Sequence, residues 1–348
     1  MEIQENIALA PLTTLRVGGS ARFFVRAGSV EDVEAGVAFA QKRNLPLFIL
    51  GGGSNVLVSD NGWPGLVLQI GVLGIDHTHE RERIRLIVGA GEDWDSFVAF
   101  CVTRNLAGVE CLSGIPGSVG ATPVQNVGAY GHEVSQTIVS VQVFDLSQKE
   151  VREMDSADCE FGYRSSIFNT REHGRYVILR VAYGLRHGGA PSLQYADLQK
   201  CFEHRSEPVT LAEVRKAVLE IRASKGMLIT PGDPDSRSAG SFFKNPLLTT
   251  AALDDLLRRA QARKLQVPSY PASPAMKKIS AAWLVENSGF TKGYSKGGAG
   301  ISSKHALAII NRGDATAVEI AALRDEIQQR VEQQWGIKLE PEPVLVGF

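Results

Sequence analysis

The chain has 348 residues and a formal net charge of −1, with 44% hydrophobic and 22% charged residues. These totals are typical of a globular protein of roughly two or three domains with a sizeable core, and they show no basic excess of the kind that binds nucleic acid. The four cysteines, Cys101, Cys111, Cys159 and Cys201, form no Cys-x-x-Cys pair, which argues against a zinc ribbon or a disulfide scaffold and fits a reducing cytoplasm. We expect no metal site.

The N-terminal segment does not read as a targeting signal. Met1–Asn6 has neither the basic nor the apolar region of a signal peptide. No apolar stretch approaches the roughly 20 residues of a membrane span. We therefore expect a cytoplasmic protein that contacts neither membranes nor nucleic acid.

The N-terminal part of the chain predicts a small β-α-β-β unit. Apolar runs predict its strands, and the stretch from Ser29 to Asp32 resembles a capping box that opens a helix extending to Asn44. The expected strands of the unit are 21–25, 47–50 and 66–70, and the apolar run 56–58 also reads as a strand.

Three consecutive glycines, Gly51, Gly52 and Gly53, interrupt this unit and are followed by Ser54 and Asn55. Glycine permits positive φ and leaves the backbone open to close approach, so main-chain N–H groups here can point at a phosphate oxygen. The stretch is neither a Gly-x-Gly-x-x-Gly that opens a helix nor a P-loop. A tight turn between two buried strands is the alternative, and this stretch alone does not decide between the two.

A second group of elements follows, ending in a helix that Thr210 and Glu213 open as a capping box and that stops near Lys225. Before this helix, the pattern predicts a strand at 84–88, a helix at 93–104, a hairpin of 138–145 with 151–154, a strand at 176–185 and a loop or short helix at 197–207.

The C-terminal part begins after a predicted linker at 226–237, which is rich in proline and glycine. The expected elements are a helix around 253–263, a helix at 279–288 with Gly289 as its C-cap, a strand at 305–310, a helix at 316–335 and a last strand at 339–346. Because helices and strands are mixed without regular alternation, the predicted fold class is α+β.

A second glycine-rich passage, residues 114–131, contains Gly114, Gly117, Gly120, Gly128 and Gly131. Long loops without regular structure are commonly functional. Two facing backbone loops suit the two charged groups of a pyrophosphate, and the side-chain amides at 125 and 126 suit the edge of a flat heterocycle. A glycine-rich crossing between subdomains is the alternative.

Together the two glycine clusters resemble the flavin-binding fold of the vanillyl-alcohol oxidase (PCMH) type. Within that fold the chain is most similar to the family of UDP-N-acetylenolpyruvoylglucosamine reductases in its longer form, over a match that runs from Thr13 to Glu342. The resemblance implies non-covalent FAD between two N-terminal subdomains, with its pyrophosphate against 51–55 and 117–121. The cofactor contacts expected from it are Gly51, Gly52, Gly53, Ser54, Asn55, Ile115, Pro116, Gly117, Ser118, Gly120, Ala121, Gln125, Asn126, Gly128 and Tyr130.

The same resemblance divides the chain into three parts. We expect a first FAD-binding subdomain at 1–75, to which a C-terminal strand at 343–348 returns, and a second at 76–228. Residues 229–342 are expected to form an α+β substrate-binding domain.

Arg164 lies among aromatic residues, next to Tyr163. An arginine in such surroundings loses hydration and needs an anion or another acceptor as partner, and a salt bridge to a nearby acid is the ordinary explanation. The resemblance implies instead that Arg164 is catalytic. Its planar fork can hold a substrate carboxylate and draw charge toward it.

Ser241 stands between a glycine and two phenylalanines, followed by Lys244 and Asn245. No Gly-x-Ser-x-Gly surrounds it, so a hydrolase nucleophile is not indicated, and a serine that caps a short element is the ordinary reading. The resemblance makes Ser241 the proton donor. A hydroxyl is a weak acid and can protonate only a strongly basic carbon, with help from its neighbours.

Glu340 and Glu342 would point to the same face of the last predicted strand, as an exposed pair or as part of a site. The resemblance implies that Glu342 is catalytic, near the same carbon as Ser241. Pro343 stands where an apolar residue is expected and removes a backbone donor, which puts the local strand pairing in doubt.

The implied substrate is a uridine diphosphate sugar. Arg222 and Lys225 end a predicted helix and suit its diphosphate, although cations are favourable at any helix C-terminus. Tyr195 matches a loop tyrosine that closes over substrate in the longer form of the family, although Ala196 replaces an expected glycine. The other expected substrate contacts are Tyr163, Lys244, Asn245 and His305.

The implied reaction reduces UDP-N-acetylglucosamine enolpyruvate to UDP-N-acetylmuramate, with NADPH as co-substrate in the same pocket. Flavin N5 would pass hydride to the methylene carbon, and Ser241 would protonate the adjacent carbon. Two alternatives remain at this point. One is an oxidase of the same fold, a class that commonly tethers flavin through His or Cys; neither glycine cluster contains a cysteine, and His132 is the nearby histidine. The other is a nucleotide-binding regulator without chemistry. We expect the protein to act as a monomer.

Overall fold

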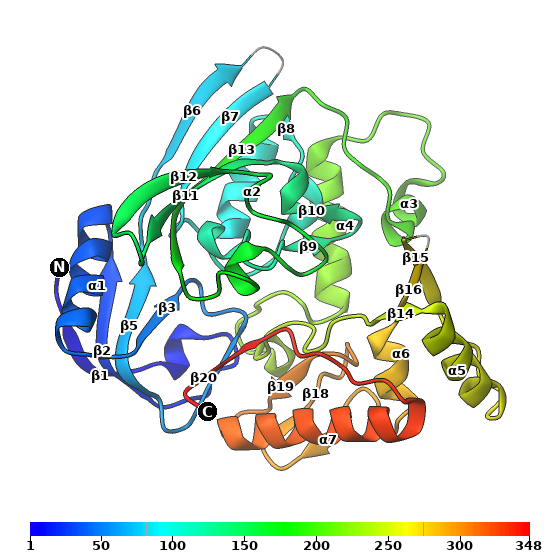
Figure 1. Cartoon of the computed structure of the whole chain (residues 1–348). Helices are drawn as coiled ribbons and strands as arrows, with labels where there is room; N and C mark the ends of the chain where they lie inside the picture. The colour runs from blue at the N-terminus through cyan, green and yellow to red at the C-terminus, as the bar shows by residue number, and fades with distance from the viewer. Residues whose placement is uncertain (81–82, 274) are drawn as a thin grey trace. The chain divides into compact units, whose positions relative to one another are not determined.

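The computed structural model describes residues 1–80, 83–273 and 275–348 (Figure 1). Contacts between Cα positions divide the chain into two compact units. The first unit comprises 1–7, 21–53 and 63–224, and the second comprises 8–20, 54–62 and 225–348. Each unit has its own hydrophobic core. The three-part division at 75, 228 and 342 stays a prediction.

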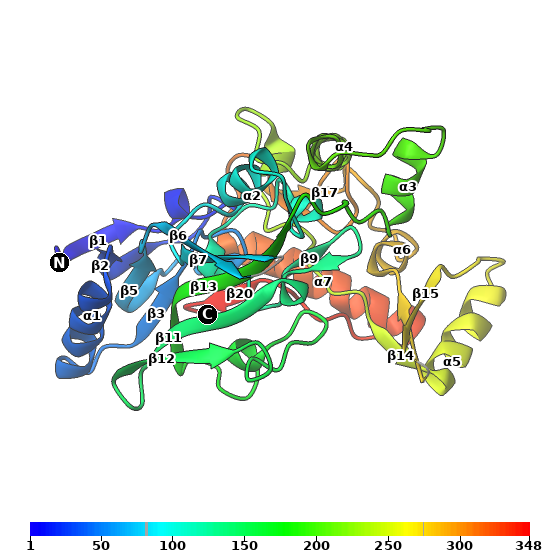
Figure 2. The same ribbon diagram turned by 90° about the horizontal axis from the view of Figure 1, so that it is seen from above.

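The first unit contains a small sheet in which β2, β5 and β3 run parallel. Helix α1 (Val30–Lys42) covers it, as Figures 1 and 2 both show, and buries Val33 and Val37. The Ser29 hydroxyl accepts a hydrogen bond from the Asp32 N–H at 3.2 Å, which caps the helix as predicted. In spatial order the strands are β1 (Gln4–Ala8), β2 (Ser20–Ala27), β5 (Trp63–Ile70) and β3 (Leu47–Leu50).

A larger antiparallel sheet forms the rest of the framework of this unit. Helix α2 (Trp94–Thr103) packs on it, with the rings of Trp94 and Phe97 centred 5.9 and 5.0 Å from the ring of Tyr183. In spatial order the strands are β12 (Glu150–Asp155), β11 (Ile138–Asp145), β13 (Tyr176–His187), β7 (Arg83–Gly89) and β6 (Ile75–Glu80), and β8 (Leu106–Ala107) also pairs with β13.

Shorter elements of the first unit surround the second glycine cluster. Helix α3 (Ala196–Phe202) packs with α4 (Leu211–Ser224), which begins with the predicted capping box: the Glu213 N–H donates to the Thr210 hydroxyl, and the Thr210 N–H donates to the Glu213 carboxylate. The others are the hairpin β9 (Gly128–Ala129) with β10 (His132–Glu133), and 3-10 helices at Glu110–Leu112, Val119–Ala121, Val134–Gln136 and Ile167–Asn169.

The second unit is built around α7 (Ala317–Trp335), whose apolar stripe fills the core. A capping box of Thr316 and Glu319 opens it, and Gly336, at φ +71°, ends it. The other helices are α5 (Thr250–Gln261), α6 (Ala281–Glu286) and 3-10 helices at Ala10–Leu12 and Pro234–Ser236. The strands are β4 (Val56–Val58) with β20 (Val344–Val346); β14 (Leu247–Thr249), β16 (Met276–Ile279) and β15 (Ser269–Ser273); and β17 (Ser295–Lys296), β18 (Ala299–Ile301) and β19 (Ile309–Asn311).

Most predicted elements are confirmed within a few residues, but three are wrong in extent. The strand expected at 305–310 is only Ile309–Asn311, because 302–308 turn through hydrogen bonds to the Ser302 hydroxyl and the His305 ring. The helix expected at 279–288 is only Ala281–Glu286, since Ile279 belongs to β16 and Asn287, not Gly289, is the C-cap. The last strand is only Val344–Val346, because prolines interrupt 339–343.

Asn311 holds segment 8–20, the N-terminal part of the second unit, in place. Its side-chain N–H donates to the carbonyls of Leu15 and Arg16 at 3.1 and 3.3 Å, and its side-chain carbonyl accepts from the N–H groups of Gly313 and Ala315. The residue is 3% exposed. One amide therefore satisfies four backbone groups next to α7.

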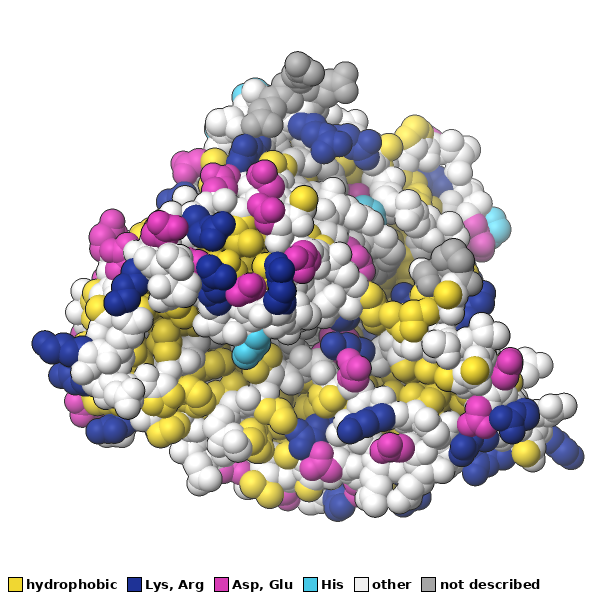
Figure 3. All heavy atoms as spheres, viewed as in Figure 1, with side chains coloured by type: hydrophobic (Ala, Val, Ile, Leu, Met, Phe, Trp, Pro, Cys, Tyr) yellow, Lys and Arg dark blue, Asp and Glu magenta, His cyan; other side chains and the backbone are white. Residues whose placement is uncertain are grey.

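Charged side chains of both signs are interspersed on the face drawn in Figure 3, in keeping with the small net charge. Among the residues that the structure describes, no helix has the length and apolar character that crossing a membrane requires.

We predict that Asn311→Ala destabilises the second unit by about 1–3 kcal/mol, because it removes four side-chain hydrogen bonds, among them the buried one to the Leu15 carbonyl. The urea midpoint of unfolding measures the change. Asn61→Ala is the control: Asn61 is exposed, so its replacement should change stability by less than about 0.5 kcal/mol. Equal stability of the two variants would contradict the role of Asn311 in holding segment 8–20.

Candidate functional site

The two glycine clusters meet within the first unit. A Cβ placed on Gly52 would lie 2.6 Å from the Gly117 Cα, and one placed on Gly51 would lie 2.9 Å from the Ser118 Oγ. Neither distance leaves room for a side chain, so the main chains of the two clusters lie directly against each other. Segments about sixty residues apart in sequence thus form the two facing loops that the glycine pattern predicts.

Backbone hydrogen bonds hold the second cluster against the residues that lead into α2. The N–H groups of Val119 and Gly120 donate to the carbonyls of Glu92 and Ala90, both at 2.9 Å, and the Trp94 N–H donates to Gly117 at 3.0 Å. A Cβ on Gly120 would lie 2.5 Å from the Ala90 Cβ, so this crossing also requires glycine. The loop is therefore a fixed part of the sheet framework.

The Ser118 hydroxyl is a buried polar group at this junction without a hydrogen-bond partner in the described part of the chain. A buried hydroxyl without a partner is costly unless a ligand supplies the bond. Together with the exposed glycine backbone, it fits an anionic, oxygen-rich group such as a phosphate.

Gly114, at the start of the second cluster, is held by two charged side chains. Its N–H donates to Asp95 at 2.6 Å, and its carbonyl accepts from the Arg222 Nε at 3.0 Å. Arg215 binds both carboxylate oxygens of Asp95, at 2.6 and 2.8 Å. Burial acts to raise the pKa of Asp95, but the hydrogen bonds from Arg215 and Gly114 outweigh it and lower the pKa.

Arg164 stands in a tight turn with the left-handed backbone angle φ +53°. Gly162 and Ser165 exchange backbone hydrogen bonds across this turn, at 2.9 and 3.2 Å. The Arg164 Nη2 donates to the Gly128 carbonyl at 2.7 Å, and its guanidinium lies 5.6 Å from the centre of the Tyr163 ring. Such strained positions cluster at functional sites, and here the strain aims the side chain at the second glycine cluster.

Two buried side chains tie the Arg164 turn to the second cluster. The Asn126 amide donates to Gly162 at 3.0 Å and to Glu133 at 2.9 Å, and its carbonyl accepts from the Ser135 N–H at 3.1 Å. The Ser166 hydroxyl donates to the Val124 carbonyl at 2.6 Å. Because Asn126 is 1% exposed and its amide already makes these bonds, its evident role is structural, and its contact with a cofactor stays a prediction.

Tyr130 joins two expected substrate contacts in the first unit. Its ring meets that of Tyr195 edge to face, with centres 5.4 Å apart, and its hydroxyl hydrogen-bonds the Arg222 guanidinium. Arg222 is 8% exposed, and burial lowers its pKa. Its bonds to Tyr130 and Gly114 support the loop, and the expected contact with a diphosphate stays a prediction.

In the second unit, the segment that carries Ser241 is clamped by backbone bonds. The Phe242 N–H donates to Leu307 at 2.8 Å, the Phe242 carbonyl accepts from the Glu342 N–H at 2.9 Å, and the Lys244 N–H donates to Glu340 at 2.9 Å. Phe242 is fully buried in the core of this unit. Ser241 and Glu342, about one hundred residues apart, are thereby fixed on neighbouring backbone segments.

Asn55 holds the same carboxylate residue from the other side. Its side-chain N–H donates to the Glu342 carbonyl at 3.2 Å, and its own carbonyl accepts from the Val344 N–H at 3.0 Å. These bonds lie on either side of Pro343, so the proline does not break the pairing, which resolves the doubt about it.

The remaining predicted residues of the second unit also have structural partners. Lys244 pairs with the exposed Glu340 at 3.3 Å, and the Asn245 side-chain carbonyl caps α6 by accepting from the Ala281 N–H at 2.9 Å. The Nδ1 of His305 accepts from the Leu307 N–H at 3.0 Å. Lys225 is the first residue of the segment 225–348 in the second unit, whereas Arg222 belongs to the first unit.

Sequence reasoning missed Asp95, Arg215 and Glu133, which hold the glycine loop and its neighbours. In the helix-starting Asp-Trp-Asp, Asp93 is the N-cap and Asp95 lies in the first turn, where an acidic residue is ordinary and signals no further role. Nothing in one sequence signals that it pairs with Arg215, 120 positions later.

Two protein-family models match parts of this chain. An FAD-binding-domain family model matches residues 21–154, and the model of the C-terminal domain of UDP-N-acetylenolpyruvoylglucosamine reductase matches 233–346. The UDP-N-acetylenolpyruvoylglucosamine reductase of Thermobifida fusca is 44% identical over 98% of this chain and 97% of its own. That of Streptomyces avermitilis is also 44% identical, over 100% and 96%. The crystal structure of the Thermus caldophilus UDP-N-acetylenolpyruvylglucosamine reductase shares the fold, with a TM-score of 0.67 at 24% identity over 99% of both chains.

We predict that Gly52→Ala separates the two clusters and weakens uptake of added FAD at least about tenfold, because the new Cβ would meet Gly117 main chain that cannot move aside. Quenching of flavin fluorescence measures the affinity. Gly28→Ala is the control, since a Cβ there meets only Asp32 Oδ2, at 3.7 Å. FAD binding by Gly52→Ala as tight as by the control would refute the close approach.

Asp95 predicts a pH dependence. Its pKa is lower in the folded chain than in the unfolded one, so its stabilising effect is present above the unfolded pKa of about 4 and is lost as pH falls through the folded pKa. Arg215→Met should therefore cost about 1.5–3 kcal/mol at pH 7 and progressively less below about pH 4. Urea unfolding at several pH values measures the difference.

Arg171→Met is the matched control for this prediction. Arg171 pairs with Glu160 at 2.7 Å, but both side chains are more than half exposed, so its loss should cost at most about 1 kcal/mol. A cost for Arg215→Met that stays constant down to pH 2.5 would show that the Asp95 charge does not matter.

Proposed function

The chain belongs to the UDP-N-acetylenolpyruvoylglucosamine reductase family, and we propose that Arg164, Ser241 and Glu342 carry out its reaction. The protein is thus an FAD- and NADPH-dependent oxidoreductase of peptidoglycan precursor synthesis. Family membership also favours the reductase over the two alternatives, a sugar or alcohol oxidase and a regulator without chemistry. In the reaction, the carbon–carbon double bond of the enolpyruvyl ether gains a hydride and a proton, and NADPH is oxidised.

The residues of the first unit fit the cofactor. The bare backbone of Gly52 against Gly117, with Gly51 beside the buried and unpartnered Ser118 hydroxyl, suits a pyrophosphate. We propose that these residues, with Gly120 and Ala121, hold that part of FAD. When bound and reduced by NADPH, FAD supplies the hydride through its N5 atom.

Ser241 is proposed to deliver the proton. The observation that carries this assignment is the bond between the Glu342 N–H and the Phe242 carbonyl, which fixes a carboxylate residue beside the segment of the hydroxyl. Since a serine hydroxyl is a weak acid, it protonates only a carbon that has become strongly basic. A rigid backbone at Phe242 and Asn55 keeps both groups oriented without reorganisation during the reaction.

Arg164 is proposed to bind the substrate carboxylate. Hydride addition to the methylene carbon sends negative charge toward that carboxylate, and a guanidinium fork held by a strained turn is preorganised to receive it. Glu342, protonated or acting through water, is proposed to share this charge. Tyr163 lies beside the guanidinium and is proposed to contact the substrate.

Contacts with the uridine diphosphate sugar remain proposals. Tyr195 is 39% exposed at the start of α3, which suits a side chain that closes over a ligand. Lys225, Lys244, Asn245 and His305 are proposed to contact the substrate together with Arg222. We also propose a cytoplasmic monomer, in keeping with free cysteines at all four positions.

We predict that Ser241→Ala retains bound FAD and its reduction by NADPH, while turnover of the enolpyruvyl sugar falls at least about 100-fold, because the proton donor is lost. Stopped-flow absorbance of the flavin measures the two half-reactions separately.

Ser238→Ala is the control, because Ser238 accepts the Gly240 N–H at 3.3 Å in the same turn. It should keep most of the turnover if the effect belongs to the hydroxyl of Ser241 and not to local structure. Equal loss of both half-reactions in Ser241→Ala would count against the donor role. Absence of substrate-dependent NADPH oxidation by the unaltered protein would overturn the proposed function itself.

A further inference from the structure

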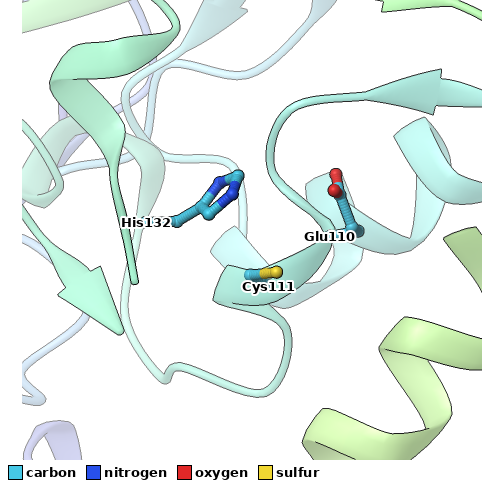
Figure 4. Close-up of side chains that lie close together, drawn as sticks. All are labelled: Glu110, Cys111 and His132. Atoms are coloured by element: carbon cyan, nitrogen blue, oxygen red, sulfur yellow. The ribbon is translucent and has the colours of Figure 1, made fainter. Parts of the chain in front are cut away.

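Three side chains with metal-binding atoms gather beside the second glycine cluster, outside the residues assigned to the reaction (Figure 4). Glu110 and Cys111 come from the 3-10 helix Glu110–Leu112, and His132 comes from β10. Their ligand atoms all lie within 4.8 Å of one another. All three residues belong to the first unit.

Glu110 is a buried carboxylate without a cationic partner. It is 1% exposed, and within the described ranges no lysine, arginine, histidine or terminal amine reaches it as an ion pair. Its oxygens accept only the N–H groups of Gly108, at 2.7 Å, and Ser192, at 3.2 Å. Each oxygen keeps a second lone pair, and a buried charge without a compensating charge is strongly unfavourable.

His132 carries an unsatisfied atom in the same place. Its Nδ1 is buried and has no hydrogen-bond partner among the described residues. Cys111, which is fully buried, reaches only the Ser192 carbonyl, at 3.3 Å. Among the described residues, a carboxylate without a counter-ion, an imidazole with one unpartnered nitrogen and a buried sulfur thus lie around one point, and a single cation would compensate all of them.

We propose that Glu110, Cys111 and His132 bind one divalent ion of the zinc class. Thiolate, imidazole and carboxylate are the donors that zinc takes, and the mixture of sulfur and nitrogen disfavours magnesium and calcium. Tetrahedral bonds of about 2.0–2.3 Å bring ligand atoms about 3.5 Å apart, so the side chains close by about 1 Å on the ion. Three protein ligands leave the fourth position to water or the Ser192 carbonyl.

The ion would join the two ends of the second glycine cluster. Cys111 precedes it and His132 follows it, so one metal closes a loop of about twenty residues that contains Gly114–Gly131. Closing a loop removes conformational freedom from the chain. This consequence rests on the proposed function of the loop, whereas metal binding itself does not.

The test uses the FAD-loaded, full-length protein after treatment with a chelator and dialysis. Titration with Co²⁺, read as a difference spectrum against the untreated protein, is expected to saturate at one equivalent with a thiolate-to-cobalt charge-transfer band. Added Zn²⁺ should remove the band. Cys111→Ala should abolish it, and His132→Ala should weaken binding at least about tenfold.

Two control variants remove other metal-binding groups. His77→Ala with His79→Ala deletes the histidine pair on β6, whose rings are 5.8 Å apart, and Cys201→Ala deletes the exposed thiol. Both should bind Co²⁺ like the unaltered protein. Absence of a one-equivalent thiolate band, or a band that survives Cys111→Ala and disappears with either control, overturns the proposal. The proposal is also overturned if the protein has no metal affinity while His132→Ala lowers its stability, since His132 would then act only as a counter-ion of Glu110. Turnover enters none of these readouts, so failure of the metal site and failure of the proposed reductase function stay distinguishable.

Discussion

The contact of Gly52 with the main chain at Gly117 is the constraint on which the first unit depends. It brings together two loops that the sequence keeps about sixty residues apart, and it leaves no room for a side chain at Gly52. Backbone N–H groups, unlike lysines, offer hydrogen bonds without the conformational freedom of a long side chain. A junction of this kind therefore presents fixed donors to a phosphate, and the buried Ser118 hydroxyl adds one more.

The polar and charged residues around this junction form hydrogen bonds that hold the loop in place. Asp95 and Arg222 each bind one backbone group of Gly114, and Asn126 connects the loop with the turn of Arg164. A guanidinium that binds a developing charge must be placed before the charge appears, since reorganisation during the reaction costs free energy. The strained φ of Arg164 is maintained by these surrounding bonds, so anchoring of the loop and placement of the Arg164 side chain belong to one network.

Local sequence patterns predicted most helices and the longer strands, but they did not predict which distant segments pair with each other. The boundaries of α7 and of the hairpin β11–β12 follow from the Thr316 cap, the apolar stripe and the Ser147–Lys149 turn. The glycine clusters and the motif residues of both units could also be found in sequence. Their partners could not: Asn55 with Glu342 and Asp95 with Arg215 depend on tertiary folding, which no local periodicity encodes. The short strands β14–β18 were missed because they lack alternation long enough to count, and β1, β6 and β8–β10 were missed as well.

Pro341 and Pro343 shorten the last strand, but they leave the backbone hydrogen bonds around Glu342 intact. Pro341 faces Phe243 in a pair whose flanking residues make the bonds, Lys244 to Glu340 and Glu342 to Phe242, so the missing N–H of Pro341 is not needed there. Pro343 likewise falls between two bonds that are made. Each ring fixes φ near −65°, and the carboxylate between the two rings has little freedom left in its backbone. The backbone bond to Phe242 holds Glu342 beside the Ser241 segment, while Glu340 is exposed and pairs with Lys244.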